Sequence, residues 1–315
     1  MQSDINPIVL SRLQKCRDLP SPPGVAEQII LLSSKTNSDM DTLAELVSMD
    51  PALSAKILRM ANSSLYMRRV KAENIQQAVI MFGWTGTLNI ALSFSLVGDM
   101  KSNAKQNGLN YELFWQRSLA AGVASKKLGE AVRYMAKEEL FLPSLLQDIG
   151  MLALDKAMPE IYKNVGDEQQ NHARILELEY EKTGSDHAAI GAWLLNRWDI
   201  PERITELISL SHSPTAPEVE LEGNELPAKC VAFSGVIADC ICSEESNRDY
   251  MKAASRAESE FNLDITDFLS LLGSATEEYQ EMATLFDVDV GDSGTLKDTA
   301  DHAKEVLAKQ AYGMM

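Results

Sequence analysis

Residues 49–63 of this 315-residue chain read MDPALSAKILRMANS, and this stretch gives the clearest structural signal in the sequence. Asp50 is a residue type that caps the N-termini of helices, and Pro51 is favoured at the first helical position. Leu53 and Ile57 then recur at helical spacing, which gives the segment one apolar face. The stretch therefore predicts a helix that begins at Pro51 and packs against a core.

Similar signals recur along most of the chain, whereas strand-like alternation of any length is missing from the sequence. Helices are predicted over residues 26–32, 38–49, 75–82, 88–97, 111–128, 138–155, 174–180, 187–198, 201–211, 229–242 and 268–286, with a marginal one over 296–312. Gly83 and Gly86 are expected to separate two of these helices. The predicted fold class is all-α.

A polar linker is predicted over residues 101–110, between an N-terminal helical half (residues 1–100) and a second half (residues 111–245). Residues 246–315 are expected to form an acidic helical extension.

The formal net charge is -17, and residues 216–315 account for most of it with 21 acidic and 7 basic side chains. Such an acidic chain is a poor binder of nucleic acid, because that affinity comes mostly from neutralised phosphates.

The sequence favours a cytoplasmic protein. Its first residues are polar and do not resemble a signal peptide, and the apolar run over residues 88–98 is too short to span a bilayer. The four cysteines form no CxxC pair, so disulfides and a zinc site are not expected. The nucleotide-binding loops GxxxxGK[ST] and GxGxxG and the motifs GxSxG and HExxH are absent from the sequence, which disfavours the corresponding enzyme classes.

Three separated segments carry recognisable motifs: residues 19–23 (LPSPP), residues 43–63 and residues 141–150 (FLPSLLQDIG). The first two are similar to the N-terminal pattern of the HDOD family of bacterial signalling proteins, and the third resembles that family's G-L-L-H-D-I-G motif. Residues 186–191 (DHAAIG) and 198–201 (WDIP) extend the resemblance, which covers about residues 13–245. It implies a multi-helix HDOD fold in which an N-terminal helical subdomain packs on a degenerate HD-type helical domain.

The resemblance also implies where a metal site would lie. HD-type phosphohydrolases hold metal with a histidine, an H-D pair and a distant aspartate, and these positions fall at Arg117, Gln147-Asp148 and Asp239. Arginine cannot act as a ligand and glutamine is a weak one, so no metal or other cofactor is expected. We expect the Arg117 guanidinium to pair with Asp148, and also with Asp239, in place of the missing cation.

At each candidate residue, a purely structural interpretation competes with a functional one. Asp148 lies in an apolar segment, so a purely structural ion pair is favoured over a ligand-sensing pocket and over a metal site. His187 and His212 fall where related two-metal subfamilies place extra ligands, yet His187 fits a first-turn core residue and His212 fits a helix end. His172 and His302 belong to no motif and are expected on the surface.

A short basic cluster, Arg68, Arg69 and Lys71, follows Tyr66. An aromatic ring beside basic side chains is suited to a phosphate or partner contact, although a solvated loop is the commoner explanation.

The leading functional hypothesis is a non-catalytic signal-transduction or scaffold protein that acts through protein–protein contacts. Its partners, implied by the family, belong to two-component or cyclic-dinucleotide circuits, and neither nucleic acid nor a membrane is expected among them. One alternative is a residual metal-dependent phosphohydrolase or phosphodiesterase that uses Asp148, His187, His212 and Asp239. A second alternative is a nucleotide or anion sensor that uses the vestigial pocket near Arg117. The oligomeric state stays open.

Overall fold

The structure is a computed structural model that describes residues 5–34, 39–66, 71–102, 108–163, 165–166, 169, 171–212, 225–243, 249–290 and 301–307. These residues form helices and turns, and no strand occurs among them. The predicted all-α class is confirmed.

The labelled elements of the described chain are fourteen α-helices and two short 3₁₀ turns. In order they are α1 (Pro7–Lys15), α2 (Gly24–Ser33), α3 (Met40–Ser48), α4 (Pro51–Ala61), α5 (Ile75–Ser102), α6 (Tyr111–Ala131), η2 (Lys137–Glu139), α7 (Phe141–Leu146), α8 (Ile149–Ala157), η3 (Pro159–Ile161), α9 (His172–Thr183), α10 (His187–Asn196), α11 (Glu202–Ser209), α12 (Glu225–Cys242), α13 (Tyr250–Phe261) and α14 (Ile265–Leu285). Residues 301–307 are also helical. As predicted, α4 begins at Pro51, and the Asp50 carboxylate accepts hydrogen bonds from the backbone nitrogens of Ala52 and Leu53.

Helix α5 contains the predicted break at Gly83, whose φ of 72° lies in the left-handed region that favours glycine. Gly86, by contrast, continues the helix. By length and composition α5 could cross a membrane, but 67% of its apolar window is buried inside the protein. Its apolar character therefore reflects its place in the core.

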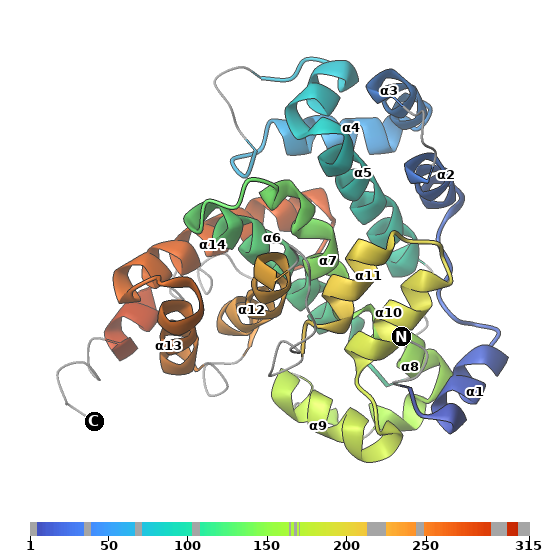
Figure 1. Cartoon of the computed structure of the whole chain (residues 1–315), viewed down its shortest axis with the longest axis vertical. Helices are drawn as coiled ribbons and strands as arrows, with labels where there is room; N and C mark the ends of the chain where they lie inside the picture. Colours follow the sequence, from blue (N-terminus) through green and yellow to red (C-terminus); the bar gives the residue numbers. More distant parts are fainter. Residues whose placement is uncertain are drawn as a thin grey trace.

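Helices α2, α3 and α4 pack around α5, and α5 in turn contacts α7 and η2 (Figure 1). Helix α6 is the centre of the second group, because α7, α12 and α14 all pack against it. One continuous hydrophobic core runs through both groups. Of the predicted linker, residues 101 and 102 belong to α5, and residues 103–107 lie outside the described residues. The division into two halves stays a prediction.

The C-terminal extension is part of this core. Helix α14 packs along α6, and the Phe286 ring that follows it stacks on Phe94 of α5, with ring centroids 4.3 Å apart. Phe286 also approaches Phe141 of α7, at 6.0 Å between centroids. Residues far apart in the sequence thus share one apolar cluster.

Helices α8 and α10 cross at very close range. A Cβ atom on Gly150 would overlap the His187 carbonyl oxygen and would lie 2.6 Å from the Gly191 nitrogen. Glycine at position 150 is therefore what lets the start of α8 meet the start of α10. This crossing places Asp148, just before α8, beside His187.

Two sequence predictions about the helices were wrong in detail. The single helix predicted over residues 138–155 is broken into η2, α7 and α8, with Asp148 (φ −98°, ψ 5°) between α7 and α8. Helices α1 and α13 were not predicted. Of the marginal helix over 296–312, residues 301–307 are helical, and the remainder lies outside the described residues.

Candidate functional site

The site is built around the Asp148 carboxylate, which is 1% exposed in the turn between α7 and α8. Oδ2 of this carboxylate faces Arg117, and Oδ1 faces histidines. Burial would raise the pKa of Asp148, but the positive charge of Arg117 and the neighbouring histidines hold it well below its usual range. Asp148 is therefore a buried anion that its neighbours stabilise.

Arg117 provides the partner on one side, from the middle of α6, with its side chain 12% exposed. Its Nη1 donates to Asp148 Oδ2, and its Nε donates to Asp239 Oδ1 on α12 at 2.8 Å. Nη2 donates to Asp239 Oδ2 at 3.4 Å and to the Gly235 carbonyl at 3.3 Å. The ion pairs expected from the sequence are present, and one guanidinium bridges both carboxylates.

Gln147 lies beside this bridge, but outside the cluster of histidines. Its Nε2 donates to the Ser144 carbonyl at 2.9 Å, and its buried Oε1 has no hydrogen-bond partner among the described residues. A Cβ on Gly235 would come within 3.0 Å of both Gln147 Oε1 and Arg117 Nη2, so Gly235 leaves room for both side chains. A metal ion of the kind that the HD-type resemblance implies does not fit at this position, because the side chains present are a guanidinium and an amide and the guanidinium engages both carboxylates.

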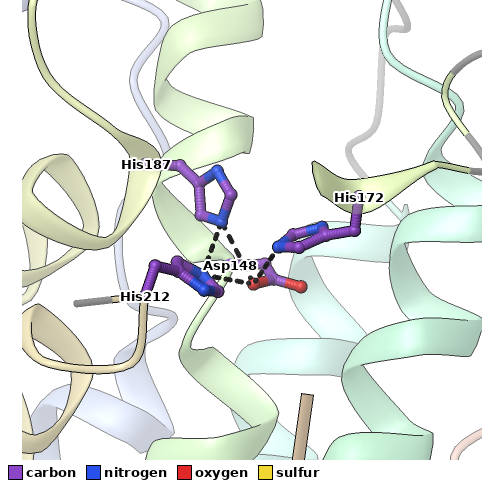
Figure 2. A group of neighbouring side chains, drawn as sticks. All are labelled: Asp148, His172, His187 and His212. Atoms are coloured by element: carbon purple, nitrogen blue, oxygen red, sulfur yellow. Dashed lines mark hydrogen bonds and ion pairs between the residues drawn. The ribbon is translucent and has the colours of Figure 1, made fainter. Parts of the chain in front are cut away.

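Three histidines surround the other side of Asp148 (Figure 2). From Asp148 Oδ1 the Nε2 atoms of His187, His212 and His172 lie at 3.2, 3.3 and 3.8 Å. The two Nε2 atoms of His187 and His212 are 2.8 Å apart. One potential ligand atom from each of these four residues lies within 4.8 Å of every other. Asp148, His172, His187 and His212 are called the histidine–aspartate cluster below.

His172 was predicted to lie on the surface, and that prediction was wrong. His172 is 8% exposed, because Asn171 caps α9 and the first turn of the helix then covers the cluster. The helix buries His172, Ile175, Glu179 and Thr183 along one face. This spacing of three and four residues was visible in the sequence, and it would have indicated that His172 points inward.

Glu179 is a second residue that the sequence analysis missed. It is fully buried, and one of its oxygens, Oε2, accepts a 2.8 Å hydrogen bond from the His187 backbone nitrogen and lies 2.7 Å from His187 Nδ1. The Tyr162 hydroxyl donates to the other oxygen at 2.6 Å. We assign the Nδ1 proton of His187 to this contact, which leaves Nε2 facing Asp148 and His212.

The three histidines of the cluster differ in the direction of their pKa shifts. Burial would lower the pKa of His187, but Glu179 and Asp148 raise it to about 10. Burial lowers the pKa of His172 well below its usual range, and burial together with His187 lowers that of His212. His172 and His212 are therefore neutral imidazoles, the form that binds metal ions.

A cavity of about 610 Å³ lies next to the cluster. Arg117, His172, His212 and Asp239 are among the residues that line it. Helix α13 also contributes to the lining, with Asp249 at its N-cap and with Lys252, Arg256 and Glu260. This volume is in the range of small-molecule sites.

Among the described residues, no contact connects the predicted basic cluster near Tyr66 with the site. Lys71 is exposed before α5, while Arg68 and Arg69 lie outside the described residues.

Comparison with known proteins identifies the family. The HDOD domain model matches residues 19–214. The fold is similar to that of an HDOD domain protein of unknown function from Geobacter sulfurreducens, with a TM-score of 0.66, 18% identity, and coverage of 89% of this chain and 96% of that chain. It is equally similar to a protein from Shewanella amazonensis SB2B described as a "Putative phosphohydrolase", with a TM-score of 0.66, 22% identity, and coverage of 88% and 98%.

A curated relative, an uncharacterized protein from Treponema pallidum (strain Nichols), is 23% identical over 223 residues. These residues are 69% of this chain but 42% of the relative, so this chain spans less than half of that protein's length. The similarity to the solved structures shows a shared fold. Because the family model matches more than half of the residues, this chain belongs to the HDOD domain family.

Proposed function

We propose that this protein is an HDOD signal-transduction protein that acts by binding and not by hydrolysis. The observation that carries the proposal is the bridge from Arg117 to both Asp148 and Asp239. These two carboxylates are the ones that the HD-type resemblance assigns to metal. A guanidinium neutralises them, but it stays protonated and cannot generate a nucleophilic hydroxide from water.

The same bridge explains why the fold retains these charges. A carboxylate as buried as Asp148 is costly unless it is paired, and the planar guanidinium offers donors to two carboxylates at once. The bridge ties α6 to α12 and to the turn before α8. A signalling function would then use the surface or the cavity of a rigid helical unit, with partners in two-component or cyclic-dinucleotide circuits as the family implies.

The test is a search for turnover. The full-length chain is incubated with a phosphomonoester and a phosphodiester in the presence of Mn²⁺, Fe²⁺ or Zn²⁺, alongside the Asp148→Asn variant. We expect equal, background rates from both proteins. Turnover that the Asp148→Asn variant loses would overturn the proposal.

A metal-dependent phosphohydrolase is the second candidate, and the histidine–aspartate cluster favours it. Three imidazoles and a carboxylate converge there beside a cavity large enough for a small substrate. This candidate predicts turnover that also falls in a His187→Asn variant. In that case the function of Arg117 would be to hold Asp148 and Asp239 in place.

The cavity also favours the sensor alternative over a pure scaffold. Inorganic phosphate, nucleoside monophosphates and cyclic dinucleotides provide a panel of probes for thermal unfolding. A ligand at 100 times its Kd stabilises a protein by about 2.7 kcal/mol. A rise in Tm that a Lys252→Ala variant loses would identify a cavity ligand.

A further inference from the structure

We propose that His172, His187, His212 and Asp148 bind one divalent transition-metal ion of the zinc or iron type. Two of these ligands, His187 and His212, fall where the resemblance to two-metal relatives places extra ligands. His172 is not implied by the resemblance, and Arg117, Gln147 and Asp239 take no part in the site. The inference goes beyond the proposed function and does not depend on whether the protein hydrolyses anything.

The geometry of the donor atoms supports one ion. His187 Nε2, His212 Nε2 and Asp148 Oδ1 form a triangle with sides of 2.8, 3.2 and 3.3 Å. Metal–ligand bonds of about 2.0–2.2 Å separate neighbouring ligand atoms by about 3 Å. His172 Nε2, 3.8 Å from Asp148 Oδ1, provides a fourth donor with a small movement of its ring.

The hydrogen bonding around the donors fits the same conclusion. Two imidazole nitrogens 2.8 Å apart must share either a proton or a metal ion, and His187 directs its other ring nitrogen to the buried carboxylate of Glu179. A carboxylate behind the ligating histidine is the usual arrangement in metal sites, since it fixes the tautomer and orients the ring. His172 Nε2 is buried and has no hydrogen-bond partner among the described residues, although it points toward Asp148.

The charge balance favours a dication. Asp148, Glu179 and Asp239 bring three carboxylates to the centre, and Arg117 brings one guanidinium. With the three histidines neutral, as ligating imidazoles are, a divalent ion would neutralise the two negative charges that remain. Two of the three carboxylates, Asp148 and Glu179, are at most 1% exposed. Three imidazoles and one carboxylate select ions such as Zn²⁺ or Fe²⁺ over Mg²⁺ and Ca²⁺, which prefer oxygen ligands.

The position of Arg117 explains why this cluster would hold one ion, whereas related enzymes hold two. It donates to Asp148 Oδ2 and leaves Oδ1 to the histidines, so Asp148 cannot bridge a second ion on the Arg117 side. The ion also has a route of entry, because His172 and His212 line the cavity of about 610 Å³. Ligand identity, outer-shell partners and access are the features by which such a site is judged.

The experiment is a zinc titration of the full-length chain, freed of metal with a chelator and then dialysed, followed by calorimetry and by elemental analysis. We expect one Zn²⁺ per chain. A His172→Asn variant, whose side chain is smaller and uncharged, should bind at least about 100-fold more weakly, since even outer-shell changes cost 10–100-fold. His302→Ala is the matched control, because the ring of the chain's fourth histidine lies against Tyr250 and outside the cluster; its affinity should be unchanged.

Less than about a tenth of an equivalent of bound zinc, or unchanged affinity in a folded His172→Asn variant, would overturn the proposal. Circular dichroism establishes whether each variant is folded. If His172→Asn does not fold, X-ray absorption at the zinc edge of the unaltered protein decides the question. Three imidazole ligands support the site, and an oxygen-only shell overturns it. Bound zinc without turnover would leave the proposed signalling function standing, whereas turnover without zinc binding would count against both proposals.

Discussion

His187 Nδ1 lies 2.7 Å from Glu179 Oε2, and neither side chain is exposed to solvent. The contact joins α9 to the first residue of α10, and the Tyr162 hydroxyl extends it through the other Glu179 oxygen. The same carboxylate thus stabilises the packing of two helices and sets the direction of one side chain in the histidine–aspartate cluster.

Replacing Glu179 with alanine should lower the free energy of unfolding by about 3–5 kcal/mol, because it leaves a buried histidine and a buried tyrosine hydroxyl without their partner. Glu179→Gln keeps the size of the side chain and one acceptor oxygen, so its loss should be smaller. Urea unfolding measures both. Equal losses in the two variants would show that the charge of Glu179 does not matter.

Arg117→Met should also destabilise the protein by about 3–5 kcal/mol, because the Asp148 carboxylate would remain buried without its guanidinium. Arg117→Lys retains a charge but loses the planar set of donors that reaches Asp239, so an intermediate loss is expected. Lys229→Met removes an ion pair with Glu225 on the surface of α12 and serves as the control, with a change of about 0.5 kcal/mol or less. A change that small in Arg117→Met would contradict the structural importance of the bridge.

Gly150→Ala should separate α8 from α10, because the added methyl group would overlap the His187 backbone. We expect a loss of about 3 kcal/mol in urea unfolding, together with weaker zinc binding. The control is Gly98→Ala in α5, where a Cβ meets nothing within 4 Å. That variant should be up to about 1 kcal/mol more stable, because alanine favours the helix. The two substitutions are thus expected to change the free energy of unfolding in opposite directions.

Lys126 predicts a dependence of stability on pH. It is buried on α6, where its Nζ donates to the Leu65 carbonyl at 2.6 Å and lies 3.3 Å from Glu138 Oε2. Burial lowers the pKa of Lys126 to about 8, although Glu138 opposes this in part. The unfolded chain keeps the proton up to a pKa of about 10.4, so between pH 8 and 10 it binds more protons than the folded chain.

Stability should therefore rise with pH across this window, by at most about 1.4 kcal/mol per pH unit. Other groups titrate there as well, so the measured quantity is the difference in unfolding free energy between the unaltered protein and Lys126→Met. From pH 8 to pH 10, we expect the free energy of unfolding of the unaltered protein to rise relative to that of Lys126→Met. A difference that stays constant with pH would exclude the lowered pKa.

Local signals were sufficient to predict most of the helices. Asp50 and Pro51 determine the start of α4 through one hydrogen-bonding side chain and one ring, both within the same turn. The break before Asp148 could not be predicted in this way. Helix α8, which follows the break, crosses α10 so closely that Gly150 lies against the His187 backbone, 37 positions later, and no local signal marks this crossing.

The residues of the site also differ in whether the sequence could predict their positions. Arg117, Asp148 and Asp239 could be predicted to meet because the HD-type resemblance implies ligand positions there, and the structure contains their ion pairs. His172 and Glu179 belong to no motif. Their inward direction follows from the buried face of α9, and their meeting with Asp148 and His187 follows from helix packing, which a single sequence does not encode locally.

The position of α6 between α12 and α14 has a consequence for biosynthesis. Leu285, the last residue of α14, is added to the growing chain 154 residues after Ala131, the last residue of α6. At about 5–20 residues per second, the apolar flank of α6 that α14 covers waits roughly 8–30 s for its partner. Residues 19–214, the part matched by the family, are synthesised before either covering helix. The apolar flank of α6 is therefore exposed in the nascent chain until α14 is made, and surface exposed in this way promotes aggregation.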